Sequence, residues 1–113
     1  MLRSELDIIL KELAAQIYDL LGDKLDKVVL YGSYARGDNT DDSDVDVLVL
    51  TKMNREENRK VFWQLNKIFS RVGLEHDILL SLFLLDTEAF YGRKEILPFY
   101  QNIEKDGVLV YAA

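Results

Sequence analysis

The chain contains no cysteine, so disulfide bonds and thiolate metal sites are excluded. It also lacks an apolar run of the roughly 20 residues that a membrane span requires. The longest such stretch, residues 78–85, is far shorter and includes Ser81. The first residues, MLRSELD, carry carboxylates where a signal peptide needs apolar side chains. We therefore expect a cytoplasmic protein that does not enter a membrane.

Basic side chains are scarce as well. Fourteen Lys and Arg residues stand against twenty Asp and Glu residues, which gives a formal net charge of −6. Proteins that hold nucleic acid by its phosphates usually present a basic face. The charge balance therefore argues against nucleic acid as a direct ligand. It favours small substrates or a protein partner with basic patches.

What is present is enough for one folded domain over residues 1–113. Hydrophobic residues make up 49% of the chain, which provides a core and excludes a disordered chain. No repeat, linker or low-complexity tract divides it. Apolar residues at helical spacing predict one helix that ends at Gly22 and another that Asn54 caps and Gly73 ends. The predicted strands are residues 28–31, 44–50, 76–82 and 108–111.

The order of these elements predicts an α/β or α+β domain with a single mixed sheet of three to four strands and helices packed on it. The second and third strands are joined by an amphipathic helix, so they should be parallel with a right-handed crossover. The first and second strands have a short connection, so they should be antiparallel.

Two carboxylates, Asp44 and Asp46, are the strongest candidates for a metal-binding catalytic site. Residues two apart on a strand point to the same face, and such a pair repels itself unless a cation lies between. Oxygen ligands of this kind suit Mg²⁺. Asp77 opens the predicted third strand, which is the parallel neighbour, so it can lie at the same edge of the sheet. Three carboxylates there can hold two metal ions about 3.5–4 Å apart for phosphoryl transfer.

The acidic residues admit two other interpretations. An isolated Asp-x-Asp is commonly part of a surface turn, but Asp46 lies within an apolar stretch where an unpaired charge is costly. Asp42, Asp44 and Asp46 also match the first, third and fifth positions of a calcium loop. Val47 and Met53 then stand where that loop needs Gly and Glu, which excludes it.

Gly32 and Ser33 follow the first predicted strand and precede a helical turn, an arrangement that can bind phosphate. Glycine lets a phosphate approach the backbone, and the N–H groups at a helix start attract anions. The pattern lacks the spacing and the lysine of a Walker A loop. Arg36 is a candidate phosphate ligand, with a salt bridge to Asp38 or Asp42 as the equal alternative.

The stretch LYGSYARGDNTDDSDVDVLVL resembles the minimal nucleotidyltransferases (MNT proteins) of the DNA polymerase β type. The pattern of that family is Gly-Ser, Arg-Gly, Ser-Asp-x-Asp and a later Asp. Here it corresponds to Gly32-Ser33, Arg36-Gly37, Ser43 to Asp46, and Asp77. The ending NIEKDGVLVY is similar as well, so the resemblance covers nearly the whole chain and implies a polymerase β-like fold.

The resemblance implies an active enzyme with two Mg²⁺ ions and ATP as the nucleotide donor. In such a site Asp44 and Asp46 bind both metals with the triphosphate. Asp77 helps to bind the metal that activates the acceptor hydroxyl. Gly32 and Ser33 hold the phosphates that leave.

The resemblance also implies a partner, because MNT proteins are commonly antitoxins of HEPN-domain ribonuclease toxins. We therefore expect transfer of AMP from ATP to a tyrosine of such a toxin, within a homo- or hetero-oligomer. One alternative is an antitoxin that neutralises its toxin by contact alone, without catalysis. The other is a nucleotidyltransferase for small molecules.

The sequence alone does not determine the roles of several other side chains. Tyr31 and Tyr34 flank the phosphate turn, and either could stack on a base. His76 precedes Asp77, so on a strand it should point away from the metals and be structural. An aromatic set near the C-terminus is either an interface or, as we favour, ordinary core: Phe90, Tyr91, Phe99 and Tyr100.

Overall fold

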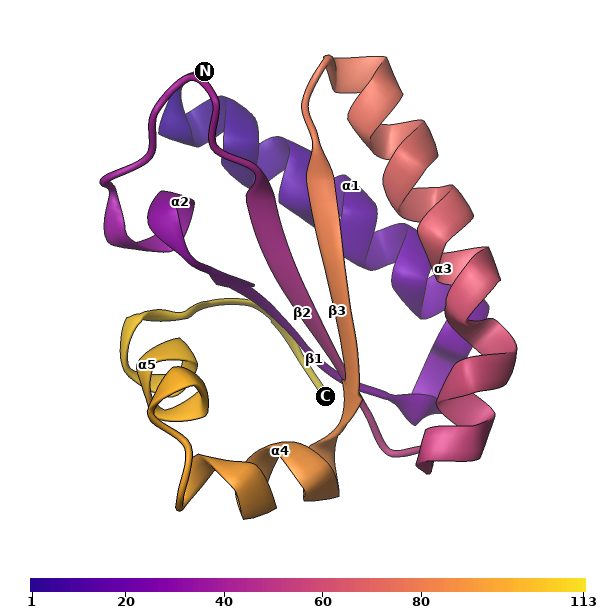
Figure 1. The fold of residues 1–113 in the computed structure, drawn as a ribbon. Coiled ribbons are helices and arrows are strands. Elements are labelled where there is room, and N and C mark those ends of the chain that lie inside the picture. Colours follow the sequence, from indigo (N-terminus) through magenta and orange to yellow (C-terminus); the bar gives the residue numbers. More distant parts are fainter.

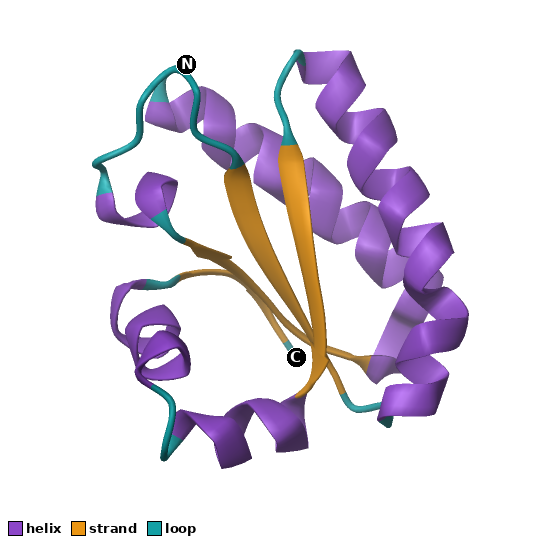
Figure 2. Cartoon of the chain, in the orientation of Figure 1, coloured by secondary structure: helices purple, strands orange, loops and turns teal.

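The structure, a computed structural model, describes all residues from Met1 to Ala113. A four-stranded sheet in the order β3-β2-β1-β4 lies between two layers of helices (Figures 1 and 2). The strands are β1 (Leu25–Tyr31), β2 (Val45–Thr51), β3 (Leu80–Asp86) and β4 (Val108–Ala112). The helices are α1 (Arg3–Leu21), a 3₁₀ turn η1 (Gly22–Lys24), α2 (Ser33–Arg36), α3 (Arg55–His76), α4 (Thr87–Lys94) and α5 (Pro98–Asp106). None of these helices combines the length and apolar character needed to cross a bilayer.

The predicted mixed sheet is confirmed. β1 pairs antiparallel with both β2 and β4, and β2 pairs parallel with β3. α3 makes the crossover between the two parallel strands, as its amphipathic pattern predicts. Its start is also confirmed, because the Asn54 side chain accepts a hydrogen bond of 2.9 Å from the backbone N–H of Glu57.

The two faces of the sheet build two apolar clusters. The larger one packs α1 and α3 against one face, to which Val45, Val47 and Val49 contribute. The smaller one packs α4 and α5 against the other face, to which Leu48 and Leu50 contribute. Since side chains alternate along a strand, Asp46 lies on the same face as Leu48 and Leu50. The candidate metal ligand Asp46 is therefore on the face of the sheet that α4 and α5 cover.

The third strand does not begin where the sequence pattern predicts. β3 runs from Leu80 to Asp86 rather than from His76 to Leu82, because α3 continues past Gly73 to His76. Gly73 is required for close packing instead of for ending the helix, since a Cβ there would lie 2.7 Å from the carbonyl oxygen of Ile78. α3 closes with the backbone N–H of Ile78 donating to Gly73 O at 2.9 Å.

Candidate active site

The turn between β1 and α2 brings the backbone directly onto a carboxylate. Gly32 has a φ of 76°, a conformation that glycine adopts at little cost. A Cβ at this position would overlap the Oδ2 atom of Asp46. Only glycine therefore allows the start of α2 and the Asp46 carboxylate to lie in contact. A phosphate at the N–H groups of this turn would also lie next to the carboxylate.

Asp44 and Asp46 lie close enough together to affect each other. Burial raises the pKa of the Asp46 carboxyl above its ordinary value, and the negative charge of Asp44 raises it further, while Arg36 lowers it. Neither carboxylate forms an ion pair or a side-chain hydrogen bond. A half-buried carboxylate with a like charge beside it is an arrangement that a divalent cation would relieve. The donor set, which consists of carboxylate oxygens, fits Mg²⁺.

The raised pKa of Asp46 has a consequence for stability without metal. A carboxyl whose pKa is higher in the folded than in the unfolded protein stabilises the fold only while it is protonated, and this contribution is lost as the pH rises through the folded pKa. We therefore expect Asp46→Asn to stabilise the metal-free protein at pH 7, because asparagine carries no charge to bury beside Asp44. Thermal unfolding in EDTA at pH 4 and pH 7 checks this, because the gain should shrink at pH 4.

Tyr31 lies beside this pair, opposite Asp46 in the register of β1 and β2. Burial raises the pKa of the Tyr31 phenol to about 12, and the charge of Asp46 contributes. The phenol therefore stays neutral at physiological pH. Tyr34 lies instead on the side of α1, where its carbonyl oxygen accepts a hydrogen bond of 3.0 Å from Arg3. The structure thus places Tyr31 beside the carboxylate pair and Tyr34 beside α1, a distinction that the sequence alone does not make.

The sequence left open whether Arg36 binds a phosphate or forms a salt bridge, and its position is compatible with both. Its Nε atom pairs with the Oδ2 atom of Asp38 at 3.1 Å, and both side chains are exposed. Its charge also reaches Asp46, whose pKa it lowers. An exposed ion pair is worth little, typically about 0–1 kcal/mol, so Arg36 can leave Asp38 for a phosphate at low cost.

Asp77 is not on a strand, so that part of the prediction is wrong. It is exposed, follows the last residue of α3 and has a φ of 54°, in the left-handed region. On β3 the residue opposite Asp46 is Ser81. The structure brings Asp44 and Asp46 together, but the two do not form with Asp77 a group whose ligand atoms all lie within 4.8 Å of one another.

The only such three-residue group joins Glu12, Glu75 and His76. His76 is the last residue of α3, not a strand residue, and its Nε2 atom lies 2.9 Å from a carboxylate oxygen of Glu12 on α1. The contact ties the end of α3 to α1. The expectation that His76 is structural agrees with this position, although His76 lies on α3 and the predicted strand begins only at Leu80.

Comparisons with known proteins identify the family. Residues 7–110 match the family described as the nucleotidyltransferase domain. A candidate protein adenylyltransferase of Methanocaldococcus jannaschii is 41% identical over 104 residues, which are 90% of this chain and 95% of the relative.

Among solved structures, a candidate nucleotidyltransferase from Sulfolobus solfataricus is 30% identical, with a TM-score of 0.51 over 96% of this chain and 85% of that one. Two more distant structures share the fold. A toxin–antitoxin complex with AMP-PNP matches at 18% identity and a TM-score of 0.54, over 91% of this chain and 73% of the other. A complex of a tri-AMPylated HEPN toxin of Shewanella oneidensis with its MNT antitoxin contains a chain that matches at 15% identity and a TM-score of 0.50. The match covers 95% of this chain and 73% of the other.

The resemblance read from the Gly-Ser to Asp-x-Asp motif is therefore confirmed. The family match extends over residues 7–110, which include the Gly32 turn and the carboxylate pair. The chain belongs to the nucleotidyltransferase domain family and is a nucleotidyltransferase.

Proposed function

We propose that this protein transfers AMP from ATP to a tyrosine of a HEPN-domain toxin in the cytoplasm and so acts as its antitoxin. The observation that carries the proposal is the contact of the Gly32 turn with Asp46 beside Asp44, in a chain 41% identical to a candidate protein adenylyltransferase. The fold is shared with an antitoxin complex that holds AMP-PNP and with one whose HEPN toxin is AMPylated.

In the proposed site each residue has a separate task. Asp44 and Asp46 would hold two Mg²⁺ ions, which supply positive charge for the triphosphate and acidify the acceptor hydroxyl. The backbone at Gly32 and Ser33 and the Ser33 hydroxyl bind the β- and γ-phosphates at the start of α2. Arg36 binds a phosphate oxygen after leaving Asp38.

The reaction is an in-line displacement at phosphorus. The tyrosine oxygen forms a bond to the α-phosphorus, and the bond from that phosphorus to the oxygen bridging to the β-phosphate breaks. Pyrophosphate leaves, the hydroxyl proton passes to solvent, and AMP stays on the tyrosine. The protein contributes alignment and electrostatic stabilisation of the developing charge.

The test uses the HEPN-domain protein encoded beside this chain, with Mg-ATP, and mass spectrometry of the intact toxin. We expect the mass of one or more AMP groups to be added on tyrosine, and the ribonuclease activity to fall in proportion. A toxin that is fully neutralised without any added mass would contradict the proposal. That outcome would favour the second candidate, an antitoxin that acts by contact alone.

The position of Asp77 is the observation that favours this second candidate, because the site then has two well-placed carboxylates instead of three. We still propose Asp77 as the third carboxylate, on the family pattern. Its place at the same end of the sheet as Asp44 supports this, since Leu79 O accepts a hydrogen bond of 2.9 Å from Val45 N.

Asp77→Gly separates the two roles of this residue. Asp77 is the only residue other than glycine with a positive φ, so glycine should stabilise the fold by about 0.5–1 kcal/mol. If Asp77 also binds metal, transfer should fall at least about 100-fold, which corresponds to about 2.7 kcal/mol. Thermal unfolding and AMP-transfer rates on the same sample check both expectations. A more stable variant with an unchanged rate would remove Asp77 from the site.

A further inference from the structure

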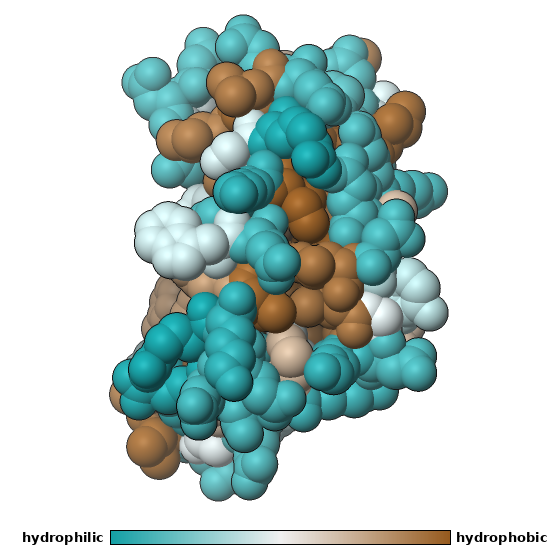
Figure 3. Space-filling model, turned by 90° about the vertical axis from the view of Figure 1, so that its right-hand side faces the viewer, coloured by the Kyte–Doolittle hydropathy of each residue, from teal (hydrophilic) through white to brown (hydrophobic).

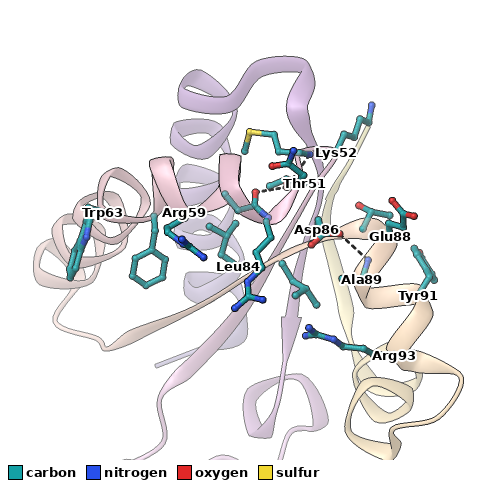
Figure 4. Close-up of a pocket in the computed structure, with 17 residues that line it drawn as sticks. Thr51, Lys52, Arg59, Trp63, Leu84, Asp86, Glu88, Ala89, Tyr91 and Arg93 are labelled. Carbon is teal, nitrogen blue, oxygen red and sulfur yellow. Dashed lines mark hydrogen bonds between the residues drawn. The ribbon is translucent and has the colours of Figure 1, made fainter.

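The largest cavity lies at the end of β3 opposite to the carboxylate pair. It has a volume of about 940 Å³, and its walls come from α3, the loop after β2, the last residues of β3 and α4 (Figure 4). β3 connects the two places, because Ser81 near its start is opposite Asp46 and Asp86 at its end lines the cavity. A seven-residue strand spans about 23 Å at about 3.3 Å per residue, so the cavity is a site of its own.

The floor of this cavity is the open edge of a sheet. β3 is the outer strand and pairs with β2 only, so its other edge has no strand partner. On the side of the molecule that carries α3, Figure 3 shows a central band of apolar surface bordered by hydrophilic side chains. The cavity itself is lined by the apolar side chains of Phe62 on α3 and of Leu84 and Leu85 on β3. An unpaired strand edge in an apolar trough is a template for an extended polypeptide segment.

The rim of this cavity has an excess of positive charge, with four basic side chains against two acidic ones: Lys52, Arg55, Arg59 and Arg93 against Asp86 and Glu88. Arg59 on α3 and Arg93 on α4 are both directed toward the space in front of Leu84 (Figure 4). Arg93 donates a hydrogen bond of 3.1 Å to the Tyr100 hydroxyl, and the Asp86 carboxylate is occupied as the cap of α4. Arg55 and Arg59, by contrast, have no ion pair and no side-chain hydrogen bond. In a chain with a net charge of −6, such a rim selects an acidic ligand.

An exposed tryptophan completes the rim. Trp63 on α3 is 74% exposed and packs edge-on against Phe62, with ring centroids 5.5 Å apart. Tryptophan and arginine are the residues most enriched at the energetic centres of protein interfaces. An open strand edge, the two unpaired arginines Arg55 and Arg59, and an exposed indole thus lie within one surface, which we name the β3 groove.

We propose that the β3 groove docks an extended acidic segment of the acceptor protein, which pairs with the edge of β3 and places the reacting tyrosine toward Asp46. The inference rests on the proposed function, because it assumes a protein acceptor. A second copy of this chain is disfavoured as the occupant, since two copies with a charge of −6 repel each other. Nucleic acid fits poorly, because an extended strand partner needs peptide groups.

The test compares groove variants with matched controls. Arg59→Glu reverses a charge in the groove, and Lys60→Glu makes the same change at an exposed neighbour that does not line it. Trp63→Ala removes an exposed apolar side chain there, and Ile8→Ala does so on α1. Calorimetry measures binding of the HEPN-domain acceptor without ATP, and steady-state assays give KM for the acceptor and kcat.

Arg59→Glu and Trp63→Ala should each weaken acceptor binding at least tenfold and raise its KM. The affinity for ATP and kcat at saturating acceptor should remain unchanged, as should all values for the two controls. Excess oligoadenylate RNA should not displace the acceptor. Displacement by RNA, or a dimer of this chain that Arg59→Glu dissolves, would overturn the inference.

The two proposals fail in different ways. Normal acceptor binding by both groove variants, with AMP transfer intact in the wild type, overturns the docking site and leaves the proposed function standing. Binding that depends on the groove, with no AMP transferred by the wild type, overturns the proposed function and leaves the docking site standing.

Discussion

Asp44→Asn and Asp46→Asn are each expected to lower the rate of AMP transfer by at least about 1,000-fold, which is about 4 kcal/mol of transition-state stabilisation. Asparagine keeps the size of the side chain and one oxygen but removes the negative charge that attracts the cation. The change should leave the fold intact, because neither carboxylate takes part in an ion pair or side-chain hydrogen bond. The measurement is the transfer rate under saturating Mg-ATP and acceptor.

The matched control is Asp42→Asn, which makes the same change at an exposed residue of the same loop. It should keep close to the full rate. Toxin neutralisation, measured in parallel, distinguishes the two candidate functions. Loss of neutralisation together with loss of transfer supports catalysis, whereas an inactive variant that still neutralises its toxin supports action by contact.

Gly32→Ala should be nearly as damaging, for a steric reason. The added Cβ would overlap Oδ2 of Asp46, and a φ of 76° with a ψ of −154° lies in a region that essentially only glycine occupies, at a cost of about 1–3 kcal/mol for alanine. Either Asp46 or the turn must move, and a displacement of about 1 Å within such a site can cost about 100-fold in rate. We expect a loss of at least about 100-fold in transfer and weaker binding of ATP.

Gly37→Ala is the control for backbone strain alone. Gly37 has a φ of 81°, but a Cβ there would meet no atom within 4 Å. Because Gly37 is in the left-handed α region, this variant should lose about 1–2 kcal/mol of stability in thermal unfolding and retain most of the transfer rate. If both glycine variants lose the same activity, the contact between Gly32 and Asp46 is not the reason for the loss.

Much of the fold could be predicted because its signals are local. The apolar spacing in α1 and α3 and the cap at Asn54 concern residues within a few turns of one another. The crossover between β2 and β3 requires parallel strands whatever the details of packing. The end of α3 was mispredicted because Gly73 has two possible meanings. The pattern indicated a helix end, while the folded chain uses the missing Cβ for close packing with Ile78.

The aromatic set near the C-terminus shows the same limit. The favoured interpretation as core is correct for Phe90 and Tyr100, which are buried. Tyr91 and Phe99 are exposed, although Phe99 contacts Tyr31 with ring centroids 6.2 Å apart. Neighbouring positions on a helix differ in burial according to where the helix lies on the sheet, and this depends on contacts distant in sequence.

The sequence by itself determined the chemical components of the site: a Gly-Ser turn after a strand, and two carboxylates two residues apart on the next. Tertiary structure decided which of these components meet. The pairing of β1 with β2 places Asp46 opposite Tyr31 and against Gly32, and the close packing of Gly73 against Ile78 leaves Asp77 before the strand instead of on it. Spacing along a strand follows from backbone geometry alone, whereas register and helix ends are set by long-range packing that no short motif encodes.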